Sequence, residues 1–282
     1  MDLFLIGLIA AVFVAFIAYC AHALSSSGAV AAAVLGTIVF GLGGFGWALV
    51  LLTFFTSSSG LSKLFSRQKI SSGVSFSKGS RRDAWQVAAN GGMAGMLALV
   101  YFVLSLGLPE PSIIQFLWIG FASSLAAANA DTWATELGLL NPWEPLLIST
   151  FKKVPKGTSG AVSLVGTLAS LAGSALIGGA AVLSLSAGWG PPAGFKSGMQ
   201  FLIITTSGMF GALIDSTLGA TIQSVYYCPV CDKETEQHPL HHCGTQTNRL
   251  RGLPWLNNDL VNAACTISGG ILGMLMAILF NN

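Results

Sequence analysis

Hydrophobic residues form long, nearly continuous runs along this chain, and polar residues gather between the runs. A helix needs about 20 apolar residues to cross the hydrocarbon core of a bilayer, so runs of this length predict membrane-spanning helices. Six runs are clear, at about residues 3–24, 84–106, 113–128, 162–183, 201–223 and 260–280. The pattern predicts an all-α fold, a polytopic transmembrane helical bundle that forms one integral membrane domain over residues 1–282.

A further run, residues 29–55, contains the interruption "GLGGFG". Glycine loosens a helix without forcing a break, so this run forms either two short or re-entrant helices or one long tilted helix. The sequence thus predicts six or seven membrane segments, give or take one. The first run lacks a basic region ahead of it and ends in "AHALSSS", a poor cleavage signal, which favours a retained helix.

Charge is scarce and unevenly placed. Only 9% of the residues are charged and 53% are hydrophobic, which excludes a soluble protein because so many apolar runs cannot be covered in water. Six basic residues lie between Lys63 and Arg82, three in "KKVPK" and three between Lys233 and Arg251. Alternation of the spans puts these loops on one face, which the positive-inside rule makes cytoplasmic.

The same charge pattern bears on partners and location. A net charge of +2 is too small to indicate nucleic acid, whereas basic residues beside membrane ends suit anionic membrane lipids. The chain carries no recognisable organelle address, so we expect a multi-pass membrane protein, located in the cell membrane if its source is bacterial, with its polar site facing the cytoplasm. Homo-oligomerisation is left open by the sequence.

Polar side chains inside membrane helices are costly, so each is a candidate for function. Arg82 and Asn90 share one side of a span and suit contact with an anion, although Asn90 equally suits an interhelical hydrogen bond. Asp215 must face other helices or a hydrated cavity, where it binds a divalent metal or pairs with an arginine. Asn258 and Asn262 suit nucleotide binding or helix stapling, and Asn258 also suits a helix cap.

The stretch "NADTWATELG" follows the apolar run at residues 113–128. Asp131 lies one helical turn from Thr135, and Thr132 lies one turn from Glu136, so carboxylates and hydroxyls enter the same crowded region. Mg²⁺ prefers hard oxygen ligands of this kind and commonly bridges protein carboxylates to substrate phosphates. The stretch therefore predicts a magnesium site.

The segment "KKVPKGTSGAVSLVG" supplies the complementary charge. Lys156 is followed by Gly157, Thr158, Ser159 and Gly160, directly before an apolar helix. Small residues at a helix start expose backbone N–H groups to an anion, and lysine adds a point charge. The order is not that of a Walker A loop, and alone it suits an ordinary helix cap. Beside the acidic stretch it predicts a phosphate cradle.

A cysteine and histidine segment, "CPVCDKETEQHPLHHCG", lies in the loop of residues 226–257 between the last two spans. Cys228 and Cys231 form a C-x-x-C pair, and Cys243 with His238, His241 or His242 would complete a tetrahedral site for structural Zn²⁺. We take His242 as the fourth ligand. An unliganded loop is the alternative, and a cytoplasmic location disfavours a disulfide.

Several of these motifs occur together in one known family. The segments "SSSGAVAAAVLG", "KGSRRDAWQVAANGG", "NADTWATELG", "KKVPKGTSGAVSLVG" and "DSTLGATIQ" resemble, in this order, the integral membrane family called domain of unknown function 92. That family includes transmembrane protein 19 and plant phytyl-phosphate kinases, and the resemblance covers nearly the whole chain. A weaker likeness extends to the phytol and dolichol kinases, which use CTP.

The resemblance implies a kinase that transfers the terminal phosphoryl group of a nucleotide, CTP in the first place, to an isoprenyl monophosphate such as phytyl phosphate. The residues expected to catalyse this transfer are Asp131, Glu136, Asp215 and Lys156, the three carboxylates holding Mg²⁺. The residues expected to bind nucleotide or acceptor are Arg82, Asn90, Thr132, Thr135, Gly157, Thr158, Ser159, Gly160, Asn258 and Asn262. The cysteine and histidine loop has no place in that chemistry.

Two rival classes also fit parts of the pattern. A transporter or flippase for a lipid-linked or anionic molecule has intramembrane carboxylates and broken helices too. The clustering of polar groups toward one face counts against it, while Asp215, which we expect to lie deepest, favours it. A non-catalytic scaffold would fit a zinc loop but would leave the acidic and basic motifs without a purpose.

Overall fold

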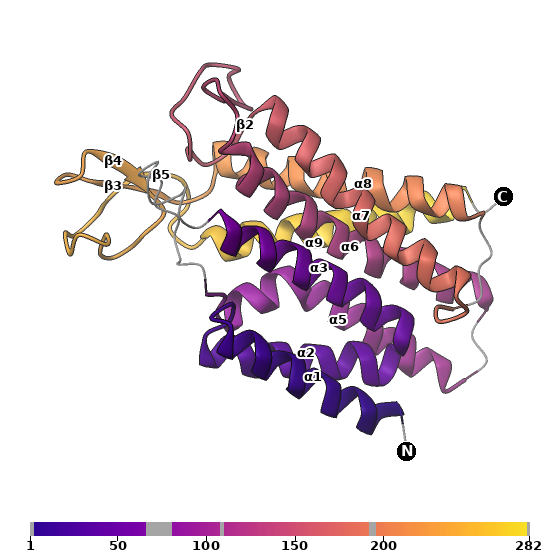
Figure 1. The fold of residues 1–282 in the computed structure, drawn as a ribbon. Coiled ribbons are helices and arrows are strands. Elements are labelled where there is room, and N and C mark those ends of the chain that lie inside the picture. Colours follow the sequence, from indigo (N-terminus) through magenta and orange to yellow (C-terminus); the bar gives the residue numbers. More distant parts are fainter. Residues whose placement is uncertain (1–2, 66–80, 108–109, 192–195, 281–282) are drawn as a thin grey trace.

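The structure, a computed structural model, describes residues 3–65, 81–107, 110–191 and 196–280. Eight helices in these ranges are long and apolar enough to cross a membrane. They are α1 (Leu3–Cys20), α2 (Ser26–Gly43), α3 (Phe45–Leu64), α5 (Ala84–Ser105), α6 (Pro111–Gly138), α7 (Leu164–Ser186), α8 (Ser197–Thr221) and α9 (Asn258–Leu279). The helices run side by side as one bundle, which confirms the predicted polytopic helical fold (Figure 1).

The run at residues 29–55 forms two helices, so the described chain has eight such helices where the sequence predicted six or seven. The break falls at Gly44, whose φ of +91° suits glycine and ends α2. Both helices are long and apolar enough to cross a membrane, and α3 continues to Leu64 through a stretch rich in serine and threonine. Hydroxyls there donate to carbonyls one turn back, as Ser58 Oγ does to Phe54 O at 2.6 Å, so polar residues remain in the helix.

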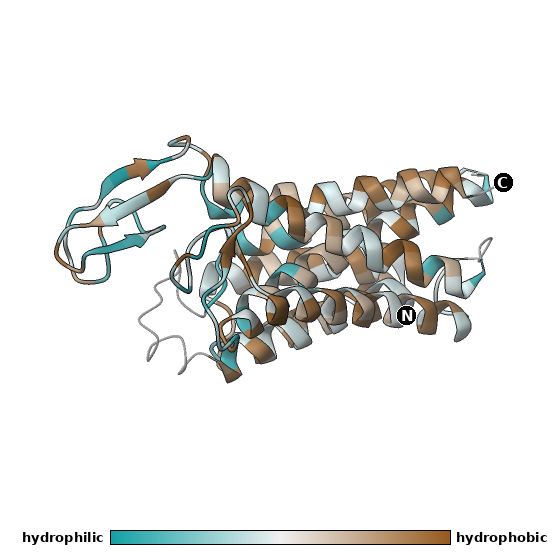
Figure 2. Ribbon diagram, turned by 90° about the horizontal axis from the view of Figure 1, so that it is seen from above, coloured by the Kyte–Doolittle hydropathy of each residue, from teal (hydrophilic) through white to brown (hydrophobic). Residues whose placement is uncertain are grey.

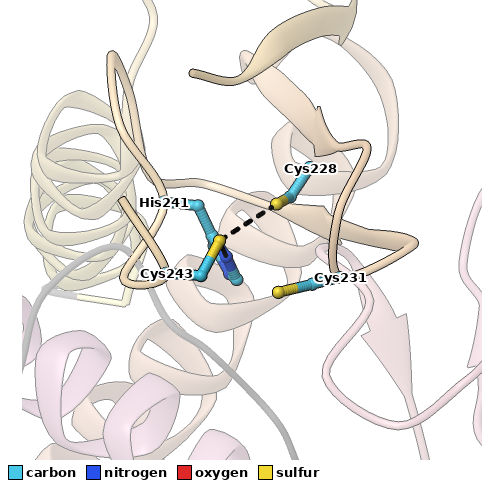
Figure 3. Close-up of side chains that lie close together, drawn as sticks. All are labelled: Cys228, Cys231, His241 and Cys243. Carbon is cyan, nitrogen blue, oxygen red and sulfur yellow. Dashed lines mark hydrogen bonds between the residues drawn. The ribbon is translucent and has the colours of Figure 1, made fainter. Parts of the chain in front are cut away.

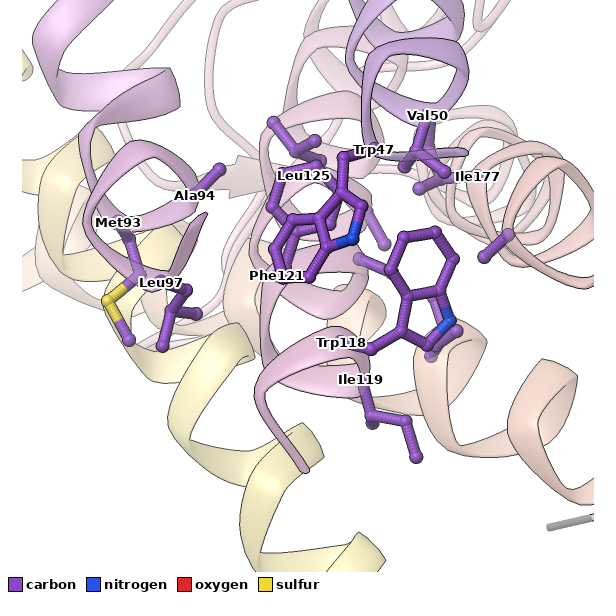
Figure 4. Close-up of a cluster of buried hydrophobic side chains, with 14 of the residues drawn as sticks. Trp47, Val50, Met93, Ala94, Leu97, Trp118, Ile119, Phe121, Leu125 and Ile177 are labelled. Carbon is purple, nitrogen blue, oxygen red and sulfur yellow. The ribbon is translucent and has the colours of Figure 1, made fainter. Parts of the chain in front are cut away.

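Helix α6 lies at the centre and packs against α3, α5, α7, α8 and α9. Its 28 residues extend about 42 Å, more than the roughly 30 Å of a hydrocarbon core, so its last turns reach the interface. The acidic stretch of residues 129–138 therefore belongs to this helix and does not follow it. Trp118 and Phe121 of α6 pack on Trp47 of α3, with ring centroids 5.3 and 4.4 Å from that of Trp47 (Figure 4).

All strands lie at one end of the bundle, opposite the two chain termini (Figure 1). Strands β1 (Leu146–Leu147) and β2 (Ala161–Val162) pair antiparallel between α6 and α7. Strands β3 (Val225–Cys228), β4 (Lys233–Thr235) and β5 (Asn248–Arg251) form an antiparallel sheet in the order β4-β3-β5 between α8 and α9. Hydrophilic residues concentrate at this end (Figure 2).

The same end carries the positive charge. Apart from Lys196, every Lys and Arg in the described ranges lies in or beside a connection at the strand-bearing end. Three of the six basic residues counted between Lys63 and Arg82 fall in residues 66–80, outside the described ranges. The predicted grouping of the basic loops on one face agrees with the order of the helices, and this face is called the basic face below.

Candidate active site

A polar cavity of about 530 Å³ opens at the basic face, bordered by α3, α5, α6, α7, α8, α9 and the loops between them. It brings together every residue predicted for magnesium, nucleotide or acceptor. Those lining residues are Arg82, Asn90, Asp131, Thr132, Thr135, Glu136, Lys156, Gly157, Thr158, Ser159, Gly160, Asp215, Asn258 and Asn262. Residues far apart in the sequence thus share one cavity, which is called the polar cavity below.

The centre of the polar cavity holds a pair of carboxyl groups, Asp131 on α6 and Asp215 on α8. The two side chains lie close enough for the charge of each to act on the other. Asp215 Oδ2 is buried and has no hydrogen-bond partner among the described residues. Two carboxyl groups this close require a proton or a cation between them, because both charges cannot otherwise be held away from water.

The depth of Asp215 differs from the sequence expectation. Asp215 lies six residues before the end of α8, and Asp131 lies seven residues before the end of α6. At 1.5 Å per residue these positions are about 9 and about 10 Å inside the helix ends. Measured in this way, Asp215 lies at about the same depth as Asp131 and is not the deepest of the acidic residues.

Glu136 is a further acidic residue of the polar cavity and lies two residues before the end of α6. Its side chain is 4% exposed, and its Oε1 accepts a hydrogen bond of 2.7 Å from Ser62 Oγ. Ser62 comes from the polar end of α3, a stretch that the hydropathy pattern did not assign to a helix. The helical spacing of hydroxyl residues at 56–62 was the signal in the sequence that would have placed Ser62 there.

Arg82 precedes α5 and is fixed by its backbone to the turn between α1 and α2. Its N–H donates to Ala23 O at 3.0 Å, and its carbonyl accepts from Ser25 N at 3.0 Å. A Cβ on Gly28 would overlap that carbonyl, so glycine is required for this close approach. Ser25 also caps α2 by accepting from Gly28 N. The segment "SSSG" therefore serves to place Arg82.

The guanidinium of Arg82 lies over the Phe54 ring, 5.5 Å from its centroid, and near Glu136. Partial burial lowers the pKa of Arg82 to about 10, and the negative charge of Glu136 acts in the opposite direction. The group therefore stays protonated at neutral pH and offers a fixed positive charge. Directly after it, Asp83 and Gln86 form a capping box that begins α5.

The glycine-rich segment lies differently from the expectation. Residues 157–160 precede β2, and α7 begins only at Leu164, with Ser163 as its cap. The segment therefore does not itself start a helix, although Ser163 at the helix start also borders the polar cavity. Gly160 has a φ of +79° and packs so closely on α8 that a Cβ there would lie 2.5 Å from Ser216 O.

The lysines of this connection separate into two groups. Lys156 borders the polar cavity, and its Nζ donates to Leu139 O just after the end of α6 at 3.1 Å. Lys152 and Lys153 are exposed and do not border the cavity.

The cap of the last span, α9, is Asn257, because its side chain accepts a hydrogen bond from Leu260 N. The alternative that Asn258 caps this helix is therefore wrong.

A chain of side-chain hydrogen bonds connects the glycine-rich segment to the loop between α8 and α9. Ser159 Oγ donates to Gln223 Oε1 at 3.0 Å, and Gln223 Nε2 donates to Glu236 Oε1 at 2.8 Å. Glu236 and Gln237 border the polar cavity. This link between the loop and the site is not predictable from the sequence, because contacts between distant segments leave no periodic signal.

The cysteine and histidine cluster lies in the same loop. Cys228, Cys231, His241 and Cys243 each offer a ligating atom, and these atoms all lie within 4.8 Å of one another (Figure 3). The fourth residue is His241, so the prediction of His242 as the fourth ligand is wrong. His241 is buried with its Nδ1 3.3 Å from Cys243 Sγ, whereas His242 is exposed.

A second cavity of about 120 Å³ lies between α1, α2, α3 and α5. Its walls are mainly apolar, with residues such as Leu35 and Phe55, and it is called the apolar cavity below. It shares Arg82, Gln86 and Asn90 with the polar cavity. A basic and amide border therefore separates an apolar space from a polar one.

Comparisons with known proteins cover nearly the whole chain. Residues 9–270 match the family described as "Integral membrane protein DUF92". The chain is 34% identical over 257 residues to Protein PGR of Arabidopsis thaliana, which covers 88% of this chain and 87% of that relative. It is 31% identical over 256 residues to an uncharacterized membrane protein of Methanocaldococcus jannaschii, covering 90% and 85%.

A further relative is Protein VTE6, chloroplastic, of Arabidopsis thaliana, which is 29% identical over 253 residues. That match covers 90% of this chain and 65% of the relative. No solved structure matches the chain.

Proposed function

The chain belongs to the DUF92 family of integral membrane proteins, and from this membership we propose that it is a membrane kinase for an isoprenyl monophosphate. It transfers the terminal phosphoryl group of a nucleoside triphosphate, CTP in the first place, and releases an isoprenyl diphosphate. The observation that carries the proposal is the contact of the polar cavity with the apolar cavity at Arg82, Gln86 and Asn90.

A ligand that suits both cavities has an anionic head and an apolar chain. Arg82 keeps its charge at neutral pH and, with Asn90, meets the phosphate of the acceptor at the border. The first part of the isoprenoid chain then enters the apolar cavity, where residues such as Leu35 and Phe55 remove it from water. A wholly polar substrate would not fill the apolar cavity.

The carboxyl pair supports a divalent cation as cofactor. Asp131 and Asp215 offer hard oxygen ligands side by side, and Asp215 Oδ2 lacks a partner among the described residues. Mg²⁺ held by these two carboxylates would offset the negative charge of the nucleotide phosphates. Glu136 lies near Asp131 and supplies a further carboxylate at the same site.

The donor nucleotide occupies the part of the polar cavity next to residues 156–160. Lys156 contributes a positive charge, and Thr158 and Ser159 contribute hydroxyls. Thr132, Thr135, Asn258 and Asn262 border the remaining wall and offer hydroxyl and amide groups to the sugar and base.

The transfer itself needs position and charge rather than a covalent enzyme intermediate. An oxygen of the acceptor phosphate, held by Arg82 and Asn90, forms a bond to the terminal phosphorus of the nucleotide. The bond from that phosphorus to the bridging oxygen breaks, and the nucleoside diphosphate leaves with the electron pair. Lys156 neutralises charge on the donor side while this happens.

The arrangement argues against alternating access. Asp131 and Asp215 lie within about 10 Å of helix ends at the basic face, and the described middle of the bundle is filled by Trp47, Trp118 and Phe121. A transporter requires a site reachable from both faces, near the bilayer midplane.

The test is phosphoryl transfer by the purified full-length protein in detergent, with Mg²⁺, phytyl or geranylgeranyl monophosphate and γ-labelled CTP. ATP, GTP and UTP run in parallel. Asp131→Asn should lower turnover at least about a hundredfold, as loss of a group that stabilises transferred charge does. Glu144→Gln removes an exposed carboxylate outside the polar cavity and should leave turnover unchanged.

Lysine variants form a second matched pair. Lys156→Gln should raise the nucleotide KM, whereas Lys153→Gln, outside the cavity, should not. Full turnover by folded Asp131→Asn protein would refute the metal-centred mechanism. Absence of transfer with every nucleotide and chain length, in folded protein, would refute the kinase and direct the next test to flux in liposomes.

A further inference from the structure

The cluster of Cys228, Cys231, His241 and Cys243 carries an inference beyond the proposed function. We propose that these four residues bind one structural Zn²⁺ and that this ion holds Glu236 against the wall of the polar cavity. The loop between α8 and α9 is then a metal-fixed part of that wall, whatever reaction the cavity supports.

Two tight turns present the four ligands. Cys228 ends β3 and Cys231 lies in the turn to β4, while His241 and Cys243 lie in a turn closed by an antiparallel bridge from Leu240 to Gln246. The second ligand of each pair is followed by a residue with a positive φ. Asp232, after Cys231, has a φ of 50°, and Gly244, after Cys243, has a φ of 81°. Such a residue turns the chain sharply, so that both ligands of a pair face the same point.

The distances fit a tetrahedral ion. Zinc binds cysteine sulfur at about 2.3 Å and histidine nitrogen at about 2.0 Å, so ligands at tetrahedron corners lie about 3.5 to 3.8 Å apart. Cys228 Sγ lies 3.6 Å from Cys243 Sγ, and His241 Nδ1 lies 3.3 Å from that same sulfur. Three sulfurs and one nitrogen favour zinc over magnesium or calcium and leave no open position for catalysis.

The loop has a small apolar core of its own, in which Val225, Tyr226 and Leu256 are the large buried side chains. Residues 222–257 form a small unit with strands of three and four residues, and units of this size usually need a metal or disulfides. Several of its large apolar side chains are exposed, among them Val230 at 70% and Trp255 at 65%. All five cysteines lie within the described ranges and are free thiols.

The ion would act on the polar cavity through Glu236. This residue directly follows β4 and lies in the segment between the two ligand turns, so one ion restrains the segment at both ends. Glu236 accepts from Gln223 Nε2 at 2.8 Å, and Gln223 in turn accepts from Ser159 Oγ at 3.0 Å. Loss of the ion should release Glu236 and, through Gln223, loosen the glycine-rich segment.

The first experiment measures metal content of the full-length protein, purified in detergent under reducing conditions without chelator. We expect about one zinc per chain. His241→Ala should lose most of it, whereas the neighbouring His242→Ala and the distant Cys20→Ser should keep it. Cobalt should replace zinc and give the absorption bands of a tetrahedral thiolate complex.

Several results would refute the proposal that these four residues bind zinc. Equal zinc in wild type and His241→Ala would mean adventitious metal, and a Cys228–Cys243 disulfide found by mass spectrometry would mean that the thiols pair instead. Protein that holds no zinc and gives no cobalt bands would also refute it.

The second experiment tests the link to the cavity by hydrogen–deuterium exchange of the same full-length protein with and without chelator. Exchange should rise at least about tenfold in the segment around Glu236 and also in residues 157–160. A rise confined to the loop would overturn the link and leave only a local zinc site. Neither readout depends on phosphoryl transfer, so failure here is distinguishable from failure of the proposed kinase.

Discussion

Replacement of Gly160 by alanine tests whether the glycine-rich segment is held rigidly against α8. Gly160 combines two constraints, a φ of +79° and a close approach to the last turns of α8. An alanine Cβ would overlap the backbone nitrogen of Ala220 and would lie 2.5 Å from Ser216 O. Both neighbours are backbone atoms, so a side-chain rotation cannot relieve the overlap and the segment itself must move.

The structure offers a control that separates these two constraints. Gly188, in the connection after α7, has a φ of +72° and no heavy atom within 4 Å of an added Cβ. Alanine in left-handed backbone costs about 1 to 2 kcal/mol at either position. Overpacking against fixed backbone adds about 1 to 3 kcal/mol at Gly160 alone. We therefore expect a destabilisation of about 3.5 kcal/mol for Gly160→Ala and about 1.5 kcal/mol for Gly188→Ala.

The assay is thermal unfolding of both variants and wild type in one detergent at one scan rate. At about 3 °C per kcal/mol, the Tm should fall by about 10 °C for Gly160→Ala and about 5 °C for Gly188→Ala. The extra loss should accompany a weaker nucleotide affinity, because movement of the segment also breaks the contact of Ser159 with Gln223. Equal Tm shifts would refute rigid packing of this segment on α8.

Four further predictions concern a buried hydrogen bond, charge and orientation. Ser62→Ala should lower the stability by about 1 to 3 kcal/mol by removing the hydrogen bond to buried Glu136, and an unchanged Tm would contradict that. Arg82→Gln should raise the KM of the isoprenyl phosphate more than that of the nucleotide. Since the pKa of Arg82 is about 10, wild-type acceptor affinity should hold at neutral pH and fall only as the pH rises through about 10, and an earlier fall would contradict this. Trypsin should cleave after Lys153 only in inverted membrane vesicles and after Lys196 only in right-side-out vesicles, and the reverse would invert the orientation.

The membrane fold was predictable because apolar runs of spanning length report directly on the bilayer. The ends of the helices were less predictable. Hydropathy falls at the first polar residues, yet the helical backbone continues wherever its hydrogen bonds are made, as in α3 through Ser58 and in α6 through Glu136. At Gly44 the opposite happens, because a helix ends although the apolar run continues. The backbone conformation of this glycine causes the break.

The composition of the polar cavity was predictable from helical spacing and from small residues beside charged ones. Its internal contacts were not, because they join segments that are distant in sequence. Ser62 and Glu136 are separated by 74 positions, and Gln223 meets Glu236 only because β3 and β4 fold the loop back. The choice of His241 over its neighbour His242 likewise depends on which ring the turn buries.

The position of the carboxyl pair follows from helix packing one turn deeper in the bundle. Helices α6 and α8 run in the same direction and both end at the basic face. If two residues of these helices are in contact, the residues four positions later in each helix therefore lie next to each other, one turn nearer the basic face. Gly211 meets Ala127 so closely that a Cβ on the glycine would lie 2.5 Å from the Cβ of Ala127. Asp215 and Asp131 each lie four residues further on. Small residues at this crossing therefore let the backbones approach, and that approach places the two carboxyl groups side by side.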